Sequence, residues 1–366
     1  MKIAILGTRG IPNFHGGFEQ FTEFFSTFLT ENNHDVYVYC SSLHPHQEKM
    51  FGNVHLIHCK DPENKIGTAG QFIYDLNCIL DSRKRNFDVI LQLGYTSSSI
   101  WHFMLPKSAT IITNMDGLEW KRSKYSAKVK LFLKYAEKIA ALNSDFLISD
   151  SIGIQEYLQK KYQKDSEFIA YGAEVFNSPD EKILNEYNLN PFEYDLVIAR
   201  MEPENNIEVI IKGYIQGKSN RKLFIVGNHK STKFGNYLYK NYSSNKNIIF
   251  NGGVYDLNKL NNLRYFSNIY FHGHSVGGTN PSLLEAMASN CFIVANQNIF
   301  NQSILGDDAL YFENETDITK ILDHSKSKYL GIIKNNTEKI HELYSWKKIN
   351  QHYLDFITKC YKKKKY

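Results

Sequence analysis

Short apolar runs, rich in β-branched and aromatic residues, alternate along this chain with segments of helix length. The runs predict two series of strands: Lys2–Leu6, Val36–Cys40, Val89–Leu93, Thr110–Asn114, Phe146–Ser149 and Phe168–Tyr171, then Leu196–Ala199, Lys222–Val226, Ile248–Phe250, Ile269–His272, Phe292–Ala295 and Leu310–Phe312. Helices are predicted between them at Gly17–Thr30, Asn206–Gln216, Pro281–Ser289 and Asp317–His324. This alternation predicts parallel sheets with crossover helices, so the expected fold class is α/β.

A stretch rich in Pro and Asn, Asn177–Glu193, separates the two series and indicates a linker with a short helix. Because 366 residues exceed what one core usually serves, we expect two doubly wound, Rossmann-like domains, residues 1–176 and 177–343. The helical segment 344–366 has an apolar stripe typical of packing and is expected to return to the first domain. Ligands bind beyond the carboxyl ends of such strands, so both sets of loops are expected to face one central cleft.

The composition is that of an ordinary folded protein, with 42% hydrophobic and 22% charged residues. The cysteines form no Cys-x-x-Cys pair, which argues against a disulfide framework or a zinc site; they are Cys40, Cys59, Cys78, Cys291 and Cys360. The N-terminus runs directly into a strand and a Gly turn rather than a signal peptide. No apolar run approaches the roughly 20 residues of a membrane helix. We therefore expect a cytoplasmic protein, or one peripheral to a membrane.

Basic residues are concentrated in two places, although the net charge of +5 is modest. One cluster is interrupted only by Glu137, and it comprises Lys121, Arg122, Lys124, Lys128, Lys130, Lys134 and Lys138. The other is the tail, Lys359 and Lys362–Lys365. For the tail we favour a solvated, disordered end. For the cluster two hypotheses stay open: a solvated helix face, or attraction to anionic lipid headgroups or a pyrophosphate.

A glycine-rich loop follows the first predicted strand. It runs from Gly7 through Gly10 to Gly16 and Gly17, ahead of Glu19, and it opens a helix. Glycines let a backbone approach a ligand, and helix-start amides favour a phosphate. The dinucleotide fingerprint G-x-G-x-x-G is absent, which argues against an NAD site. The alternative is two unrelated turns.

A second motif, Asp116-Gly117-Leu-Glu119-Trp120, follows the strand that ends at Asn114. A carboxylate at this place could orient an acceptor hydroxyl or take its proton. The alternative is an Asp-Gly turn, which is common. Glu119, Trp120 and the neighbouring basic cluster support the functional interpretation.

A third motif, Ala199-Arg200-Met-Glu202-Pro-Glu204, follows the first strand of the second series. An Arg at the carboxyl end of a strand is well placed to bind a diphosphate through two parallel hydrogen bonds. The alternative is a surface ion pair with Glu202 or Glu204.

The fourth motif is the most specific, and it runs from His272 through a Gly pair, Gly277 and Gly278, into a helix. Asn280 can cap that helix with Pro281 at its first position. The amides of Thr279 and Ser282, with the helix dipole, predict an anion site. Glu285 lies one turn in and could accept hydrogen bonds from two ribose hydroxyls. The alternative is a capped helix alone.

These motifs resemble glycosyltransferase family 4, a retaining family with the GT-B fold. Gly16-Gly17-Phe18-Glu19 resembles its Gly-Gly-x-Glu loop, Arg200 its arginine, and Glu285 the second Glu of its Glu-x7-Glu motif. The closer resemblance is to bacterial rhamnosyltransferases within that family. It covers nearly the whole chain, through stretches such as Gly-Thr-Arg-Gly-Ile-Pro, Asp-Gly-Leu-Glu-Trp-Lys-Arg and Gly-His-Ser-Val-Gly-Gly-Thr-Asn-Pro-Ser.

Two positions depart from the broad family pattern. Gly277 stands where the first Glu of Glu-x7-Glu is expected, and Asn205 where a phosphate-binding Lys usually follows the Arg. The loss of the first Glu fits an altered donor such as a 6-deoxy sugar. The missing Lys leaves more of the diphosphate charge to Arg200, the helix amides and Lys230 or Lys233. Both departures look like features that the rhamnosyltransferase subgroup shares, so they do not indicate an inactive enzyme.

The resemblance implies a retaining rhamnosyltransferase that uses dTDP-L-rhamnose and a lipid-diphosphate-linked sugar in bacterial surface polysaccharide synthesis. The implied catalytic residues are Asp116, Arg200 and Glu285. The implied donor-binding residues are Gly16, Gly17, Glu19, Arg200, Gly227, Gly277, Gly278, Thr279, Asn280, Ser282 and Glu285. The implied acceptor-side residues are His15, Asp116, Glu119, Lys121 and Arg122.

The remaining expectations concern metals and partners. No Asp-x-Asp motif occurs, so no divalent metal and no other cofactor are expected. The expected partners are the nucleotide-sugar, the lipid-linked acceptor and the inner face of the bacterial plasma membrane, with no nucleic acid, and with the chain a monomer or homodimer. Alternatives are a UDP- or GDP-sugar donor, or a non-catalytic nucleotide-sugar-binding protein. An epimerase or dehydrogenase ranks low, because its glycine fingerprint is absent.

Overall fold

The computed structural model describes residues 1–14, 16–122 and 125–365. These residues form two compact units. The first comprises Met1–Lys121, Tyr125–Tyr171 and the C-terminal segment from Trp346, and the second comprises Gly172–Ser345 with Arg122. The chain passes between the units at Tyr171, whereas the sequence places the boundary at residue 176.

The first unit is built on an eight-stranded sheet in the order β3-β4-β2-β1-β5-β6-β7-β8. Its strands are β1 (Lys2–Leu6), β2 (Asp35–Ser41), β3 (Met50–Phe51), β4 (Val54–Cys59), β5 (Val89–Leu93), β6 (Thr110–Asn114), β7 (Phe146–Ser149) and β8 (Glu167–Phe168). Its helices are α1 (Gly17–Glu31), α2 (Glu63–Ile66), α3 (Gly70–Ser82), α4 (Ala127–Asn143), α5 (Ile152–Tyr162) and α13 (Trp346–Lys365), with short 3-10 turns η1 (Gly67–Ala69), η2 (Ser99–Met104) and η3 (Glu119–Lys121).

The central strands of this sheet are buried on both faces, as their continuous apolar runs predict. Strand β1 pairs in parallel with β2 on one side and with β5 on the other. The chain builds outward from β1 to β4 and then crosses back to β5, so the order of the strands reverses between β1 and β5. Such a reversal is where doubly wound sheets bind ligands, beyond the carboxyl ends of the strands.

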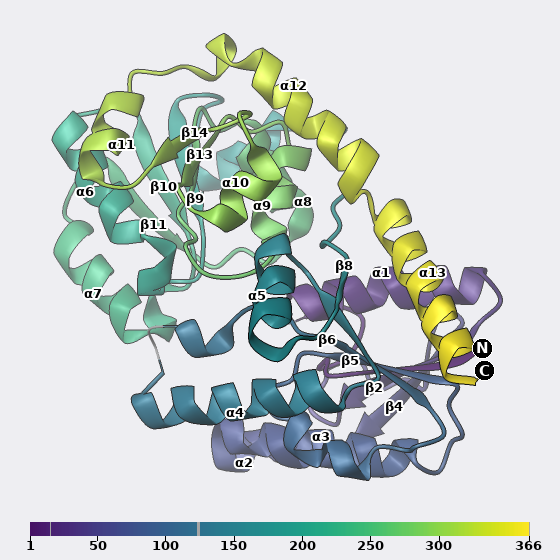
Figure 1. Cartoon of the computed structure of the whole chain (residues 1–366). Coiled ribbons are helices and arrows are strands. Elements are labelled where there is room, and N and C mark those ends of the chain that lie inside the picture. Colours follow the sequence, from purple (N-terminus) through teal and green to yellow (C-terminus); the bar gives the residue numbers. More distant parts are fainter. Residues whose placement is uncertain (15, 123–124, 366) are drawn as a thin grey trace. The chain divides into compact units, whose positions relative to one another are not determined.

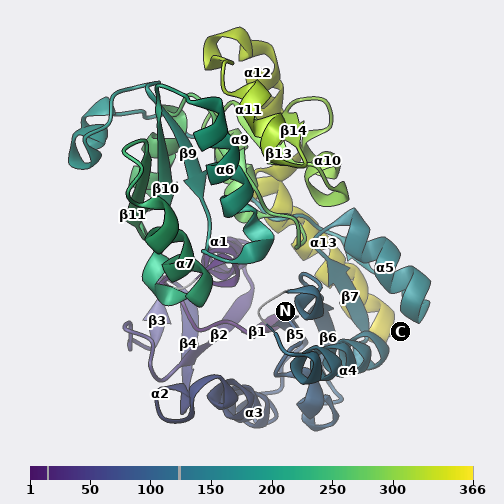
Figure 2. The ribbon, with the colours of Figure 1, turned by 90° about the vertical axis from the view of Figure 1, so that its left-hand side faces the viewer.

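Helices α2, α3 and α4 form one layer along a face of this sheet, and α1 and α13 cover the other face (Figure 1, Figure 2). In the second layer, Phe24 of α1 stacks on Trp346 of α13 at 4.7 Å, and Phe21 lies 4.6 Å from Tyr353. The apolar stripe of the C-terminal segment is therefore buried packing within the first unit. Its last turns are helical rather than disordered: Lys364 donates to Asp145 at 2.5 Å, which corrects the expectation of a disordered tail.

The second unit is built on a six-stranded sheet in the order β11-β10-β9-β12-β13-β14, with all ladders parallel. Its strands are β9 (Tyr194–Ile198), β10 (Lys222–Val226), β11 (Ile248–Gly252), β12 (Tyr270–His272), β13 (Ile293–Asn296) and β14 (Leu310–Phe312). Its helices are α6 (Ile207–Gly217), α7 (Lys233–Tyr242), α8 (Leu257–Tyr265), α9 (Pro281–Ala288), α10 (Ile299–Leu305), α11 (Glu315–Ile321) and α12 (Leu330–Lys339), with short turns η4 (Glu181–Tyr187), η5 (Pro203–Asn205), η6 (His229–Ser231), η7 (Lys326–Lys328) and η8 (Ile340–Tyr344).

The second sheet has the same kind of strand order as the first. The chain builds outward from β9 to β11 and then crosses to β12 on the other side of β9. The reversal therefore lies between β9 and β12, and the loops that follow these two strands carry Arg200 and Gly277. The predicted α/β class, with two doubly wound sheets, is confirmed. Within the described part of the chain, no helix has the length and hydropathy that crossing a bilayer requires.

Candidate functional site

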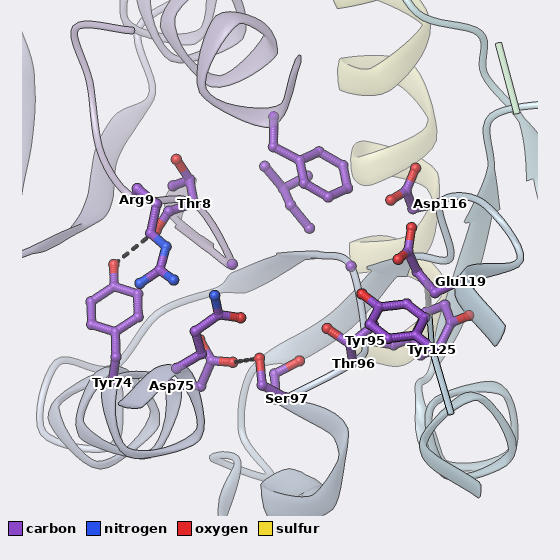
Figure 3. A pocket seen from close by; sticks show the side chains of 16 residues that line it. Thr8, Arg9, Tyr74, Asp75, Tyr95, Thr96, Ser97, Asp116, Glu119 and Tyr125 are labelled. Atoms are coloured by element: carbon purple, nitrogen blue, oxygen red, sulfur yellow. Dashed lines mark hydrogen bonds between the residues drawn. The ribbon is translucent and has the colours of Figure 1, made fainter. Parts of the chain in front are cut away.

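A cavity of about 260 Å³ opens in the first unit at the reversal between β1 and β5. The loops that follow β1, β5 and β6 line it, together with one face of α3 (Figure 3). Gly7 allows these loops to meet: its φ is 90°, and a Cβ there would lie 2.1 Å from the carbonyl oxygen of Leu93. The first glycine of the Gly-rich loop is therefore required by the close approach of two strand ends.

The cavity wall is polar and rich in carboxyl groups. Asp116 and Glu119 lie on one side of it, and Arg9, Tyr74 and Asp75 on the other (Figure 3). Asp75 accepts a hydrogen bond from the Ser97 hydroxyl at 2.5 Å. Carboxylates and hydroxyls can bind the hydroxyl groups of a sugar ring through hydrogen bonds. The structure thus brings together two of the predicted acceptor-side residues with three that the sequence did not indicate.

The Asp116 loop is held by two hydrogen bonds that both involve the Asn114 side chain. Asp116 adopts a φ of 43°, and its amide donates to the Asn114 side-chain oxygen at 2.9 Å. The Asn114 amide group in turn donates to the Tyr353 hydroxyl at 2.9 Å. The C-terminal helix therefore fixes the strand end from which Asp116 extends, a role that its apolar stripe does not reveal.

A buried carboxylate, Glu137 of α4, anchors the other end of the same loop. It accepts hydrogen bonds from Trp120 Nε1 at 2.9 Å and from the hydroxyls of Tyr157 and Tyr162, both at 2.7 Å. It also pairs with Lys161 at 3.0 Å. Glu137, the single acid of the basic cluster, thus points into the unit, where it positions Trp120 next to Glu119.

Asp150 follows β7 and is a further carboxyl group close to Asp116. Burial raises its pKa well above the ordinary value, and the negative charge of Asp116 raises it further. Two neighbouring carboxylates resist double ionisation. Asp150 therefore favours its neutral, protonated form beside Asp116.

Several predicted residues of this unit lie away from the cavity wall. Glu19 is buried, and its carboxylate accepts from the Arg9 amide at 2.8 Å and the Thr8 hydroxyl at 3.3 Å, so it holds the loop rather than lining the cavity. The others that do not line it are Gly16, Gly17 and Lys121, and Arg122, which belongs to the second unit, does not line it either. His15 lies outside the described residues. A role for these residues in binding stays a prediction.

Replacing Asp75 by Asn is expected to stabilise the protein above pH 6. Burial raises the pKa of Asp75 from 3.8 to about 6. The unfolded chain ionises first as pH rises, so stability falls between pH 4 and pH 6 and stays about 3 kcal/mol lower above that window. Asn removes this loss and can still accept from Ser97. Urea unfolding at pH 4 and pH 8 measures the difference.

Asp81, on the same helix, provides the control, because its replacement by Asn is expected to change the stability in the opposite direction. Although burial opposes it, hydrogen bonds from Arg85 and Tyr39 hold the pKa of Asp81 below its usual value. Its contribution to stability is present at neutral pH and lost in acid, so Asp81→Asn is expected to destabilise at pH 8. If Asp75→Asn destabilised the protein at pH 8, as Asp81→Asn is expected to do, the assignment of Asp75 as a destabilising carboxylate would be wrong.

In the second unit, the loops after β9 and β12 are bound to each other. Asn206 donates to the Gly273 carbonyl at 2.8 Å, and the Ser275 amide donates to the Glu204 carbonyl at 3.0 Å. Arg200 extends into solvent from the first of these loops. Asn205, which stands where the resemblance leads us to expect a lysine, is buried and donates to the Arg200 carbonyl at 2.7 Å. The amide at position 205 thus stabilises the turn that carries Arg200.

The loop after β10 reaches the same edge of the sheet. The Gly227 amide donates to the Gly252 carbonyl at 2.8 Å, and the Thr232 hydroxyl donates to the Met201 carbonyl at 2.6 Å. Lys230 and Lys233 are exposed on the turn and helix that follow. The structure therefore places these two lysines on a segment bonded to the Arg200 loop, where they can supply positive charge that Asn205 does not.

Helix α9 begins as the fourth motif predicts, with Asn280 as its cap and Pro281 at its first position. The Asn280 side chain accepts from the Ser282 amide at 2.9 Å, so that amide already has an acceptor. Thr279 is buried, and Gly278 is partly exposed. Gly277 has a φ of 141°, a conformation that other residues rarely adopt. The position of the missing family Glu is therefore built for glycine.

Arg264 of α8 is the residue of this site that sequence reasoning missed. Its side chain is 1% exposed, and it pairs with Glu285 at 2.5 Å and donates to the Ser282 hydroxyl oxygen at 3.2 Å. The Tyr270 hydroxyl lies 2.8 Å from the same Ser282 oxygen. The Glu285 side chain is 17% exposed. Its carboxylate is therefore held by a buried ion pair with Arg264 and is still accessible at the surface. A lone Arg in a helix gives no sequence signal of this role.

Two histidines stack beneath the same loop. The rings of His272 and His274 lie 4.4 Å apart with an interplanar angle of 16°. Burial and the charge of Arg200 lower the pKa of His274 to about 3, and burial lowers the pKa of His272 well below its usual value. Both rings are therefore neutral at physiological pH. They contribute stacked, buried packing to this loop rather than added positive charge.

Two family models match separate halves of the chain. Residues 1–174 match a domain of unknown function, DUF1972, and residues 181–328 match glycosyl transferases group 1. No curated protein sequence gives a significant match. The second half of the chain thus contains a glycosyl transferases group 1 domain.

Solved structures that share the fold cover almost the whole chain. Sucrose-phosphate synthase from Thermosynechococcus elongatus is 15% identical with a TM-score of 0.81, covering 98% of this chain and 98% of that one. HepE from Anabaena, in complex with UDP and glucose, is 13% identical with a TM-score of 0.74, covering 98% and 100%. A trehalose-6-phosphate protein from E. coli, bound with UDP-2-fluoro glucose, is 10% identical with a TM-score of 0.70, covering 97% and 98%.

At these identities the structural likeness shows the fold alone. That fold is GT-B, so the predicted fold class is confirmed. With the group 1 domain match, it supports a glycosyltransferase.

Proposed function

We propose that this chain is a retaining rhamnosyltransferase. It would transfer rhamnose from dTDP-L-rhamnose to a sugar on a lipid-diphosphate carrier during bacterial surface polysaccharide synthesis. The group 1 domain match supports the class of reaction. The motif resemblance of the whole chain supports the donor, and the Gly-specific backbone at Gly277 supports a donor pocket without the family's first Glu.

The observation that carries the donor site is the fixed carboxylate of Glu285. Arg264 holds it at 2.5 Å beside the capped start of α9, at the edge of the sheet where Arg200 also emerges. A carboxylate fixed in this way can accept hydrogen bonds from two ribose hydroxyls without first being ordered. Arg200 and the helix start, with Lys230 and Lys233, would stabilise the diphosphate that leaves, which is preorganised electrostatic catalysis.

The cavity of the first unit is proposed to bind the acceptor sugar. Asp116 would orient the acceptor hydroxyl and take its proton as the oxygen attacks the anomeric carbon. The bond from that carbon to the diphosphate oxygen breaks, and its electron pair leaves with the nucleotide. Attack would come from the face that the nucleotide leaves, so that configuration is retained with no enzyme nucleophile.

A donor panel tests the proposal against its main alternative, a UDP- or GDP-sugar. The ligands of HepE and of the E. coli protein favour UDP-sugars as the second candidate. The wild-type chain is assayed with dTDP-L-rhamnose, UDP-glucose, UDP-galactose and a GDP-sugar, each with a synthetic lipid-diphosphate sugar and each with and without EDTA. We expect transfer from dTDP-L-rhamnose with EDTA present, and an anomer by NMR that matches the donor.

Three outcomes would contradict parts of this proposal. Transfer from a UDP-sugar with none from dTDP-L-rhamnose refutes the donor. Turnover abolished by EDTA and restored by Mg²⁺ refutes metal independence. If the wild type bound nucleotide-sugar but transferred nothing with any pair, the non-catalytic binding protein would be the better account, and Arg200→Ala would then change binding alone.

The proposed site of action is the cytoplasmic face of the bacterial plasma membrane, where the chain would be peripheral. A lipid-borne acceptor requires the enzyme to work at a bilayer surface. The proposal includes neither a nucleic acid partner nor a cofactor, and the chain acts as a monomer or homodimer.

A further inference from the structure

The helix layer α2–α3–η2–α4 of the first unit has an outer surface of one charge. It comprises residues 60–86, 99–107 and 126–143, and the helices run side by side along one face of the sheet (Figure 1, Figure 2). Its exposed charged residues are all basic: Lys60, Lys65, Arg83, Lys84, Lys107, Lys128, Lys134 and Lys138. We call this the layer surface.

Every acid within those three ranges has a hydrogen-bond or ion-pair partner, although Glu63 and Asp81 stay partly exposed. Asp61 and Glu63 pair with Arg9 at 2.8 and 2.5 Å, and Asp81 pairs with Arg85. Asp75 is bonded to Ser97, and Glu137 is 1% exposed and paired with Lys161. The ion pairs of these acids therefore go to Arg9, Arg85 and Lys161, which are not among the exposed cations of the layer surface, although the charge of Lys84 also acts on Asp81.

Large apolar side chains are exposed on the same layer. They are Ile66, Ile73, Leu80, Phe103, Val129, Leu131, Tyr135 and Leu142. Leu131 is 71% exposed, Phe103 66% and Tyr135 59%. The four elements that carry these residues are in contact: α2 packs on α3, and η2 packs on both α3 and α4. Phe72 of α3 also meets Phe132 of α4 edge-on at 5.6 Å.

Helix α4 shows how the two kinds of residue are combined. Lys128, Leu131, Tyr135, Lys138 and Leu142 recur at spacings of three and four residues, so they lie on one face, and all are exposed. The opposite face is buried in the unit. An exposed helix face that mixes lysines with bulky apolar side chains, with no acid, is the pattern of a helix lying in a membrane interface.

We propose that the layer surface binds an anionic lipid bilayer, with its lysines against phosphate headgroups and its apolar side chains in the interface. Charge complementarity selects this occupant, because the surface offers cations without the carboxylates that a protein partner of mixed charge would meet. This proposal rests on the proposed function in one respect: a lipid-borne acceptor explains why the chain would bind a bilayer. Binding itself requires no donor or acceptor.

Vesicle co-sedimentation of the full chain tests the proposal. The vesicles are phosphatidylcholine alone, or equal parts of phosphatidylcholine and phosphatidylglycerol. We expect binding to the anionic vesicles only. Each lysine removed should weaken it about fivefold, so the triple variant Lys84→Gln, Lys128→Gln, Lys138→Gln should lose about a hundredfold. The matched control replaces three exposed lysines of the second unit, Lys222, Lys240 and Lys246, and should bind as the wild type does.

A second variant separates insertion from simple adhesion. Leu131→Ser with Tyr135→Ser keeps every charge, and we expect it to lose the fraction of binding that survives high salt. Turnover with a short, water-soluble acceptor should be unchanged in both variants, which shows that they fold. If no donor supported turnover by the wild type, the proposed function would fail while the vesicle result still stood.

Two results would overturn the inference. One is equal binding of the wild type to both kinds of vesicle, or equal binding of the triple and control variants. The other is vesicle binding that persists in the triple variant while turnover with the lipid-linked acceptor is lost. That combination would assign the layer surface to a different partner, such as an acidic protein.

Discussion

Asp116→Asn is expected to lower turnover about 10²- to 10⁴-fold, the usual contribution of a positioned general base. Asn keeps the shape of the side chain and its place at the cavity wall, but it cannot take a proton. The loss should therefore fall on kcat, with little change in the donor KM, because Asp116 lies in the first unit, whereas Arg200 and Glu285, which carry the proposed donor site, lie in the second. Steady-state kinetics with a fixed acceptor measure both.

Asp150→Asn is the matched control for this prediction. It is the same isosteric change one strand away, at a carboxyl group whose burial and neighbouring Asp116 already favour the neutral form. Its removal should leave turnover within about tenfold of the wild type. Equal losses in the two variants would contradict the assignment of Asp116 as the base.

Most strands of both sheets follow from features that the sequence displays. Buried parallel strands are continuous apolar runs, so β1, β5 and β6 were predicted with their true ends. Strand β4 was missed because His55 and His58 interrupt its apolar pattern, and β3 because it has only two residues. Such strands are defined by the neighbours with which they pair, and a single-sequence pattern does not contain that information.

The candidate site likewise contains residues that the sequence could predict and residues that it could not. Asp116 and Glu119 could be placed at the cavity because they follow a strand end, and every strand end of a parallel sheet faces the same edge. Asp75 and Arg264 lie inside helices, where their spacing is that of ordinary surface residues. Only tertiary packing brings Asp75 to Ser97 and Arg264 to Glu285. Glu137 was seen as an interruption of a basic cluster, yet it anchors Trp120.

Arg264→Met is expected to destabilise the second unit by about 3–5 kcal/mol, because it leaves the buried side of Glu285 without its partner. It should also raise the donor KM, since the carboxylate proposed to bind the ribose is no longer fixed. All three tryptophans, Trp101, Trp120 and Trp346, lie in the first unit, so fluorescence does not report on this change. Amide hydrogen exchange of α8 and α9 measures the local free energy of opening.

Arg221→Met separates stability from function in the same unit. Arg221 pairs with the buried Asp195 at 3.0 Å, at the start of β9 and therefore at the opposite end of the sheet from Arg200. Its loss should destabilise the unit to a similar extent and leave the donor KM unchanged. A double variant, Arg264→Met with Glu285→Leu, should recover most of the stability and none of the activity, because an apolar pair replaces the buried charges. Recovery of donor binding in that double variant would show that Glu285 does not hold the nucleotide.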